Sequence, residues 1–172
     1  MKLDNKELNE LRYIMDQTYA SLIAVSNKLQ TAGDSYSGDL TSKQLLTLLA
    51  ILHIPEGDAT IINIAGKLTT TKQNATRIIK SLEKKNYIKV VPSEKDKRAV
   101  NVVLTEAGIH SLSKNSKDAK KNFMTDIFND FSKEELNTLW QLLKKLYSYD
   151  GVPMDGFEER VKMPNISAEV LV

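Results

Sequence analysis

The stretch from Gly66 to Gly108 reads GKLTTTKQNATRIIKSLEKKNYIKVVPSEKDKRAVNVVLTEAG, and its first half predicts a helix entered through a tight turn. Thr70 and Gln73 have the spacing of a capping box, which marks the first residues of many helices. Apolar residues then recur at helical spacing between residues 72 and 85, at Ala75, Ile78, Ile79 and Leu82. Asn86 fits the left-handed position that ends many helices, because Asn tolerates a positive φ better than most residues.

Two runs rich in β-branched residues follow, YIKVV at residues 87–91 and AVNVVL at residues 99–104. The polar segment PSEKDKR separates them, so the pair predicts a β-hairpin. On the other side, TIINIAGKL from Thr60 predicts a helix of about two turns. The order of short helix, tight turn, helix and hairpin is that of a winged helix-turn-helix.

Amphipathic segments flank this module on both sides. Residues 5–29 have a single apolar helical stripe, whereas TAGDSYSGD at residues 31–39 has the composition of a loop. A buried helix is expected from Thr41 to His53, starting with a capping box between Thr41 and Gln44. After the hairpin, one helix is expected from residue 105 to about 129, and another begins with a capping box between Ser132 and Glu135.

We therefore predict a mainly α-helical fold with a small β-wing. The winged helix-turn-helix occupies residues 41–104, dimerisation helices occupy residues 5–30 and 105–150, and residues 151–172 form a C-terminal extension. The apolar stripes of the flanking helices are too wide to be covered within one small chain, so we expect a homodimer.

Composition limits the other possibilities. The chain has 172 residues, of which 41% are hydrophobic and 27% are charged, and it has no Cys, which excludes disulfides and thiolate metal sites. No run approaches the roughly 18 apolar residues of a membrane span, and the N-terminal residues are too charged for a signal peptide. We expect a cytoplasmic protein without a membrane partner.

The charge is unevenly distributed. Residues 60–105 contain ten Lys and Arg and three Asp and Glu, a net charge of +7, whereas the whole chain has a formal charge of +2. The rest of the chain must therefore carry −5. Clustered cations repel one another unless an anion compensates them, which favours a polyanionic partner for the central module.

The polar face of the predicted second helix has side chains suited to the major groove of DNA. Gln and Asn suit adenine, Arg suits guanine, Thr methyl groups suit thymine, and Lys suits phosphates. The candidate recognition residues are Thr70, Thr71, Lys72, Gln73, Asn74, Thr76, Arg77 and Lys80. The alternative is an ordinary solvated helix face.

The tip of the hairpin carries Lys95, Asp96, Lys97 and Arg98, and we expect it to reach the minor groove. An acid beside DNA is unfavourable unless it serves another group, so Asp96 is predicted to orient Arg98 through a charge-assisted pair. The alternative is a hairpin tip whose charges only keep it soluble.

The quoted stretch resembles the winged helix-turn-helix of the MarR-type transcriptional regulators. The resemblance lies in LEKK before the wing, the D-x-R pattern at residues 96–98 and the LT-x-x-G pattern at residues 104–108; the order of elements extends it over residues 5–150. It implies a homodimer that binds a pseudo-palindromic site in double-stranded DNA, usually represses nearby genes and is often released by a small-molecule effector. It also gives Arg98 the minor-groove role, supported by Asp96. Asn86 departs from the family's usual Gly.

An enzyme is not expected, because the sequence has no Gly-rich phosphate loop, no Cys and no recognisable Ser and Asp context for its two His residues. His53 and His110 leave metal sensing as an alternative, but two distant imidazoles are a weak ligand set, and we predict no metal and no cofactor. The alternative function is a winged-helix protein-interaction module without specific DNA binding, which should show a weaker salt dependence.

Two further expectations concern apolar residues. A pocket for an effector is predicted between the helical and DNA-binding parts, lined by Tyr13, Met15, Tyr19, Leu48 and His53. The apolar residues of the extension are expected to dock on the helical region or on the partner subunit; these are Phe157, Val161, Met163, Ile166 and Val170–Val172.

Overall fold

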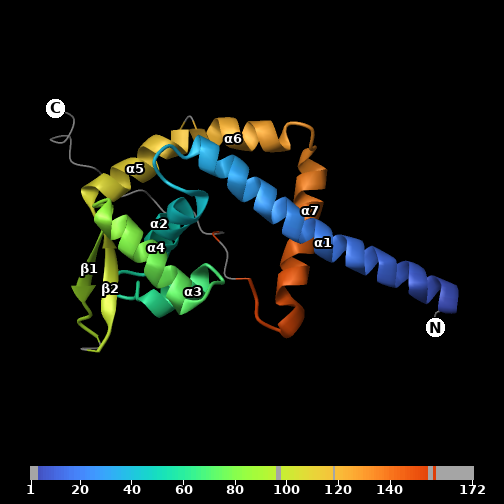
Figure 1. Cartoon of the computed structure of the whole chain (residues 1–172), viewed down its shortest axis with the longest axis horizontal. Helices are drawn as coiled ribbons and strands as arrows, with labels where there is room; N and C mark the ends of the chain where they lie inside the picture. The colour runs from blue at the N-terminus through green and yellow to red at the C-terminus, as the bar shows by residue number, and fades with distance from the viewer. Residues whose placement is uncertain (1–3, 96–97, 118, 155–156, 158–172) are drawn as a thin grey trace.

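The computed structural model describes residues 4–95, 98–117, 119–154 and 157. Within these residues the order of elements is α1 (Asn5–Tyr36), α2 (Ser42–His53), α3 (Ile61–Lys67), α4 (Lys72–Lys84), β1 (Ile88–Pro92), β2 (Val100–Leu104), α5 (Glu106–Lys117), α6 (Ala119–Phe128), α7 (Lys133–Tyr147) and the 3-10 turn η1 (Ser148–Asp150) (Figure 1). The predicted mainly α-helical fold with a small β-wing is confirmed.

Local signals in the sequence place several element boundaries correctly. Thr41 and Gln44 form both hydrogen bonds of a capping box at the start of α2, and Ser132 and Glu135 do the same for α7. Asn86 follows α4 with a φ of 62°, as predicted for a helix end.

The predicted end of the first helix is wrong, because α1 continues through the expected loop to Tyr36. Gly33 is buried where α1 meets Ser42 at the start of α2 and Phe123 of α6, and a Cβ at this position would lie 2.5 Å from the Ser42 Oγ atom. Gly33 therefore serves the close approach of helices rather than a turn.

One other predicted boundary is wrong, and one is not tested. Helices α5 and α6 cover the segment expected to form one helix after the hairpin, and residue 118 between them lies outside the described residues. The cap of α4 is Thr71, whose hydroxyl accepts a hydrogen bond from the Asn74 backbone N–H, whereas the backbone N–H of Thr70 still donates to Ala65 in α3. Thr70 thus belongs to the end of the preceding turn.

The core of the winged module surrounds α2, which contacts α3, α4, α5 and β2. Its most deeply buried side chains include Leu40, Leu48, Ile64, Leu82, Ile88 and Val102. The two strands pair antiparallel from Ile88 opposite Leu104 to Pro92 opposite Val100, and a bridge from Thr60 to Asn101 ties the hairpin to the start of α3. The hairpin is thereby attached to the start of α3 near its turn end.

The helical region leaves much apolar surface uncovered. The N-terminal part of α1 extends away from the winged module, and α7 lies on the side of the molecule opposite the hairpin (Figure 1). Exposed large apolar side chains on these two helices are Leu11, Tyr13, Ile14, Met15, Tyr19, Ile23, Val25, Leu139, Trp140, Leu142, Leu143 and Leu146. Among the described helices, none is long and apolar enough to cross a membrane.

Phe157 is the only residue of the proposed docking set that the structure describes. Its ring meets the His53 ring edge to face, with 5.1 Å between centroids, and the Lys67 ammonium lies 5.8 Å from its centre. Phe157 thus contacts α2 and α3 of the winged module. The remaining apolar residues of the extension lie outside the described residues.

Candidate nucleic-acid interface

Helix α4 has one face turned into the core and one turned to solvent. Ala75, Ile79 and Leu82, spaced by four and three residues, are buried against α2, α3 and β1. The rest of α4 has four cations, Lys72, Arg77, Lys80 and Lys84, against the single acid Glu83. The face available to a partner is therefore positively charged.

The predicted recognition residues occupy this outer face and the turn before it. Thr71, Lys72, Gln73, Arg77 and Lys80 are exposed, and Thr70, Asn74 and Thr76 are half-buried. A shallow hollow brings together Gln73, Thr76, Arg77 and Lys80 with two residues from the next turn, Ser81 and Lys84. Thr76 uses its hydroxyl locally, since it donates to the Lys72 carbonyl at 2.7 Å.

Three of these side chains form a chain of hydrogen bonds. The Asn74 Nδ2 atom donates to the Thr70 hydroxyl at 2.8 Å, and the Arg77 Nη2 atom donates to the Asn74 Oδ1 atom at 2.8 Å. The chain runs from the tight turn to the middle of the exposed face, so the turn and Arg77 are connected.

The turn between α3 and α4 is closed by backbone hydrogen bonds. Thr69 has a φ of 49°, and its N–H donates to the Gly66 carbonyl, while the Thr70 N–H donates to the Ala65 carbonyl. The Thr69 hydroxyl also lies 2.8 Å from the hydroxyl of Tyr147, at the end of α7. This bond links the C-terminal helix to the helix-turn-helix.

The wing is held to the loop between α2 and α3. Lys95 forms an ion pair with Asp58, with 2.6 Å between Nζ and Oδ1, and the Asn101 side chain donates to the Gly57 carbonyl at 2.9 Å. Lys95 is thus tied to this loop, and Arg98 is exposed. Asp96 and Lys97 lie outside the described residues, so the pairing of Asp96 with Arg98 stays a prediction.

Sequence reasoning missed Asp58 and Asn101 as wing supports. Asn101 is buried, and its Oδ1 atom has no hydrogen-bond partner within the described part of the chain. A polar residue inside the otherwise apolar strand VNVVL was the available signal. No comparable signal distinguishes Asp58, because its pairing with Lys95 depends on where the folded wing lies relative to the loop between α2 and α3.

The five predicted effector residues are not brought together. Tyr13, Met15 and Tyr19 are exposed on α1, and Leu48 is fully buried in the winged module. His53 binds the Leu49 carbonyl through Nδ1 at 2.8 Å. In the described parts of the chain, no group of three or more His, Asp or Glu residues could hold a metal ion.

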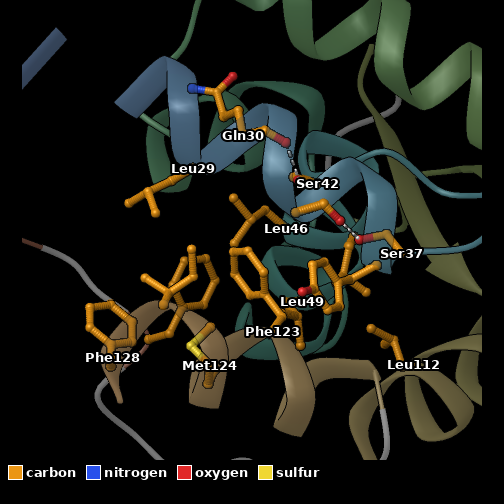
Figure 2. Close-up of a pocket in the computed structure, with 15 residues that line it drawn as sticks. Leu29, Gln30, Ser37, Ser42, Leu46, Leu49, Leu112, Phe123, Met124 and Phe128 are labelled. Carbon is orange, nitrogen blue, oxygen red and sulfur yellow. Dashed lines mark hydrogen bonds between the residues drawn. The ribbon is translucent and has the colours of Figure 1, made fainter. Parts of the chain in front are cut away.

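A different hollow lies between α1, α2 and α6 (Figure 2). It has a volume of about 410 Å³ and is almost entirely apolar, and none of the five predicted residues lines it. Its lining includes Leu29, Leu46, Leu49, Phe123, Met124 and Phe128. At its edge the Tyr36 hydroxyl donates to Asp126 at 2.5 Å, and this hydrogen bond raises the pKa of Tyr36.

The family model described as MarR family matches residues 40–100 of this chain, and several known proteins are similar to it in sequence. The HTH-type transcriptional regulator PapX of Escherichia coli is 27% identical over 129 residues, which cover 74% of this chain and 78% of PapX. The HTH-type transcriptional regulator SarZ of Staphylococcus haemolyticus is 30% identical over 112 residues, covering 64% of this chain and 71% of SarZ. The transcriptional repressor MprA of Escherichia coli is 32% identical over 90 residues, covering 52% of this chain and 51% of MprA.

Solved structures show the same fold. A MarR/EmrR family transcriptional regulator from Acinetobacter sp. ADP1 superposes with a TM-score of 0.67 at 26% identity, over 80% of this chain and 97% of that chain. The S. aureus MepR protein in its DNA complex superposes with a TM-score of 0.66 at 23% identity, over 76% of this chain and 96% of that chain.

Proposed function

Because this chain belongs to the MarR family of transcriptional regulators, we propose that it binds a pseudo-palindromic operator as a homodimer and represses the genes beside it. Its relatives are named as transcriptional regulators, which confirms the prediction of a regulator rather than an enzyme. The observation that carries the proposal is the cationic outer face of α4, which is entered through a tight turn and stands in the same module as a basic wing.

The face of α4 suits the major groove, which is wide enough to admit a helix. Gln73 and Arg77 are exposed in the first half of α4, where a recognition helix contacts base edges. Lys80 and Lys84 stand further along, where phosphates are the natural partners. Arg98 of the wing is assigned to the adjacent minor groove, with Asp96 as its orienting partner.

The homodimer is supported by the uncovered apolar surface of α1 and α7. A second copy would cover these side chains and place two winged modules side by side. Two copies of α4 would then read two half-sites about one helical turn apart. Residues 5–30 and 105–150 serve this assembly, whereas residues 41–104 serve DNA.

Repression is supported by the similarity to MprA, which is named as a transcriptional repressor. An operator placed between a promoter and a reporter gene tests the direction of regulation. Expression that falls when the protein is produced supports repression, and expression that rises identifies an activator.

Release by an effector is supported by the apolar hollow rather than by the five residues predicted from sequence. A hollow of about 410 Å³ is within the range of small-molecule sites. It joins α2 of the winged module to α1 and α6 of the helical region, so an apolar molecule inside it would contact both regions. Denaturing extraction of the purified protein followed by mass spectrometry would detect such a molecule.

Selection from random duplex DNA tests the central proposal. We expect the enriched sequences to contain two related half-sites, and fluorescence anisotropy on the winner to show affinity that falls steeply with salt as phosphate counterions are released. No enrichment, together with a shallow salt dependence, would instead support a winged-helix module that binds protein.

A further inference from the structure

Asn74 stands in the first turn of α4, and its side chain is held at both ends. Its backbone N–H donates to the capping hydroxyl of Thr71 at 3.2 Å. Its Nδ2 atom donates to Thr70, and its Oδ1 atom accepts from Arg77, both at 2.8 Å. A half-buried amide with these partners is not free to turn toward a base edge.

The orientation of this amide follows from its neighbours. The Arg77 guanidinium has only donors, so the atom of Asn74 that faces it must be the carbonyl oxygen. The NH₂ group then faces the Thr70 hydroxyl, which can accept. The reversed amide would place N–H groups against N–H groups, so one arrangement is strongly favoured.

Arg77 keeps its base-reading edge in this arrangement. Its bond to Asn74 occupies one N–H of Nη2. Whichever N–H of Nη2 is used, one parallel pair of donors stays available, either from Nη1 and Nη2 or from Nε and Nη2, and such a pair has the geometry that guanine O6 and N7 require. The bond to Asn74 therefore restricts a long, flexible side chain without consuming the donors needed for recognition.

Gln73 provides the contrast on the same turn. Its amide is exposed, and no hydrogen bond joins its side chain to any residue that the structure describes. Two neighbouring amides of similar chemistry therefore differ in what they can do. Gln73 can adapt to a base, whereas Asn74 is engaged with its own helix.

We infer that Asn74 is a positioning residue that holds Arg77 for the recognition of a guanine, and that it does not itself read a base. The inference rests on the proposed function, since it assigns roles within the DNA-binding face of α4. It replaces the expectation that Asn74 contacts adenine directly.

Selection from random duplex DNA, carried out in parallel on the wild type, three variants and one control variant, tests this assignment. Arg77→Lys keeps the charge but not the fork, so it should lower the preference for one guanine in each half-site by about tenfold. Asn74→Ala should lower the preference at that same position by about fivefold, because Arg77 loses its support. Asn74→Asp keeps an oxygen for Arg77 and should retain the guanine preference, while its added negative charge weakens binding to every duplex.

The control is Gln73→Ala, which removes a neighbouring amide and should alter preference at a different base pair. Circular dichroism melting of each variant separates misfolding from lost recognition. Two results for Asn74→Ala would overturn the inference while leaving the proposed function intact. One is a loss of preference at a base pair other than the guanine that Arg77→Lys affects, and the other is an unchanged guanine preference. If the wild type enriches no sequence, the proposed function fails and this inference falls with it.

Discussion

At Gly108 the first turn of α5 lies directly against the backbone that leads into the wing. A Cβ at this position would overlap with the carbonyl oxygen of Tyr87. The same carbonyl accepts from the Thr105 N–H at 3.0 Å, and the Thr105 hydroxyl accepts from the Gly108 N–H at 3.0 Å. The absence of a side chain at Gly108 thus lets α5 start where the two ends of the hairpin meet.

Gly108→Ala should destabilise the protein by about 2 kcal/mol, because the overlapping atom belongs to the backbone and cannot rotate away. Gly66→Ala is the matched control, since nothing lies within 4 Å of the corresponding Cβ in α3. That change should be neutral or stabilise by up to about 1 kcal/mol through helix propensity. Thermal unfolding followed by circular dichroism measures both, and equal shifts in the two variants would contradict the packing argument.

Arg98→Ala should weaken binding to the selected operator by roughly 1 to 3 kcal/mol, because the minor groove concentrates negative potential around a guanidinium. Lys95→Ala should weaken DNA binding less, since the Lys95 ammonium is already paired with Asp58. Loss of this exposed ion pair should itself change the stability of the fold little. Fluorescence anisotropy at constant salt compares the two. An Arg98 variant with unchanged affinity would remove the wing from the interface.

At the scale of elements, the capping box of α7 makes the stability of this helix depend on pH. The Ser132 N–H donates to a Glu135 carboxylate oxygen at 2.8 Å, and this bond, followed by the interaction of the carboxylate with the Ser132 side chain, lowers the pKa of Glu135. A lowered pKa in the folded state means that the ionised carboxylate stabilises the fold. This contribution is fully present at pH values above the pKa that Glu135 has in the unfolded chain. It is lost as the pH falls through the lower pKa that Glu135 has in the folded protein.

Glu135→Gln should therefore be less stable than the wild type at pH 7, with a difference that shrinks as the medium becomes more acidic than the ordinary range of Glu. The amide keeps an oxygen acceptor but does not titrate. The free energy of unfolding, measured with urea at pH 7 and at a pH below the ordinary pKa of Glu, gives the size of the effect. Glu134→Gln, which removes a charge from the same turn but not from the capping bond, is the control; an identical pH profile for both would show that only helix-end charge matters.

The bond between Tyr147 and Thr69 joins α7 to the turn before the recognition helix. Tyr147→Phe removes only the hydroxyl, so it should lower DNA affinity about twofold to tenfold, corresponding to one modest hydrogen bond, without changing the oligomeric state. Fluorescence anisotropy measures the DNA affinity, and light scattering measures the oligomeric state. Tyr149→Phe is the control, because the Tyr149 side chain is highly exposed. Equal losses of DNA affinity in the two variants would argue against a specific role for the bond between Tyr147 and Thr69.

At the scale of the whole molecule, the uncovered face of α7 should hold the dimer together. Leu142 is 58% exposed in the single chain. Leu142→Glu should produce monomers in light scattering and weaken operator binding at least tenfold, since a charge would be buried at the contact. Gln141→Glu adds the same charge to the neighbouring residue and should leave the dimer intact. A dimeric Leu142→Glu protein would place the contact elsewhere.

The sequence predicts the features that depend on neighbouring residues and fails where distant residues decide. The capping box at Thr41 and the positive φ at Asn86 involve only a few successive positions, and both are confirmed. The continuation of α1 through Gly33 depends on Phe123, ninety positions away. The apolar hollow likewise needs α6 placed beside α1 and α2, and no local pattern contains that information.

The same distinction holds for the candidate interface. The composition of α4 and the wing indicates a cationic face, because charge and helical period can be read directly from residues 72–98. The engagement of Asn74 with Arg77 and of Lys95 with Asp58 depends on side-chain geometry. Residue type therefore identifies the face but does not separate the residues that contact a partner from those that support them.

The uninterrupted length of α1, from Asn5 to Tyr36, restricts how this chain can change during evolution. Each residue of an α-helix rotates the following ones by about 100°, so a single deletion in the middle of α1 would turn the apolar residues before it away from those after it. Loss or gain of seven residues rotates the face by only about 20° and shifts it by about two turns. Insertions and deletions in this helix should thus be tolerated in steps near seven.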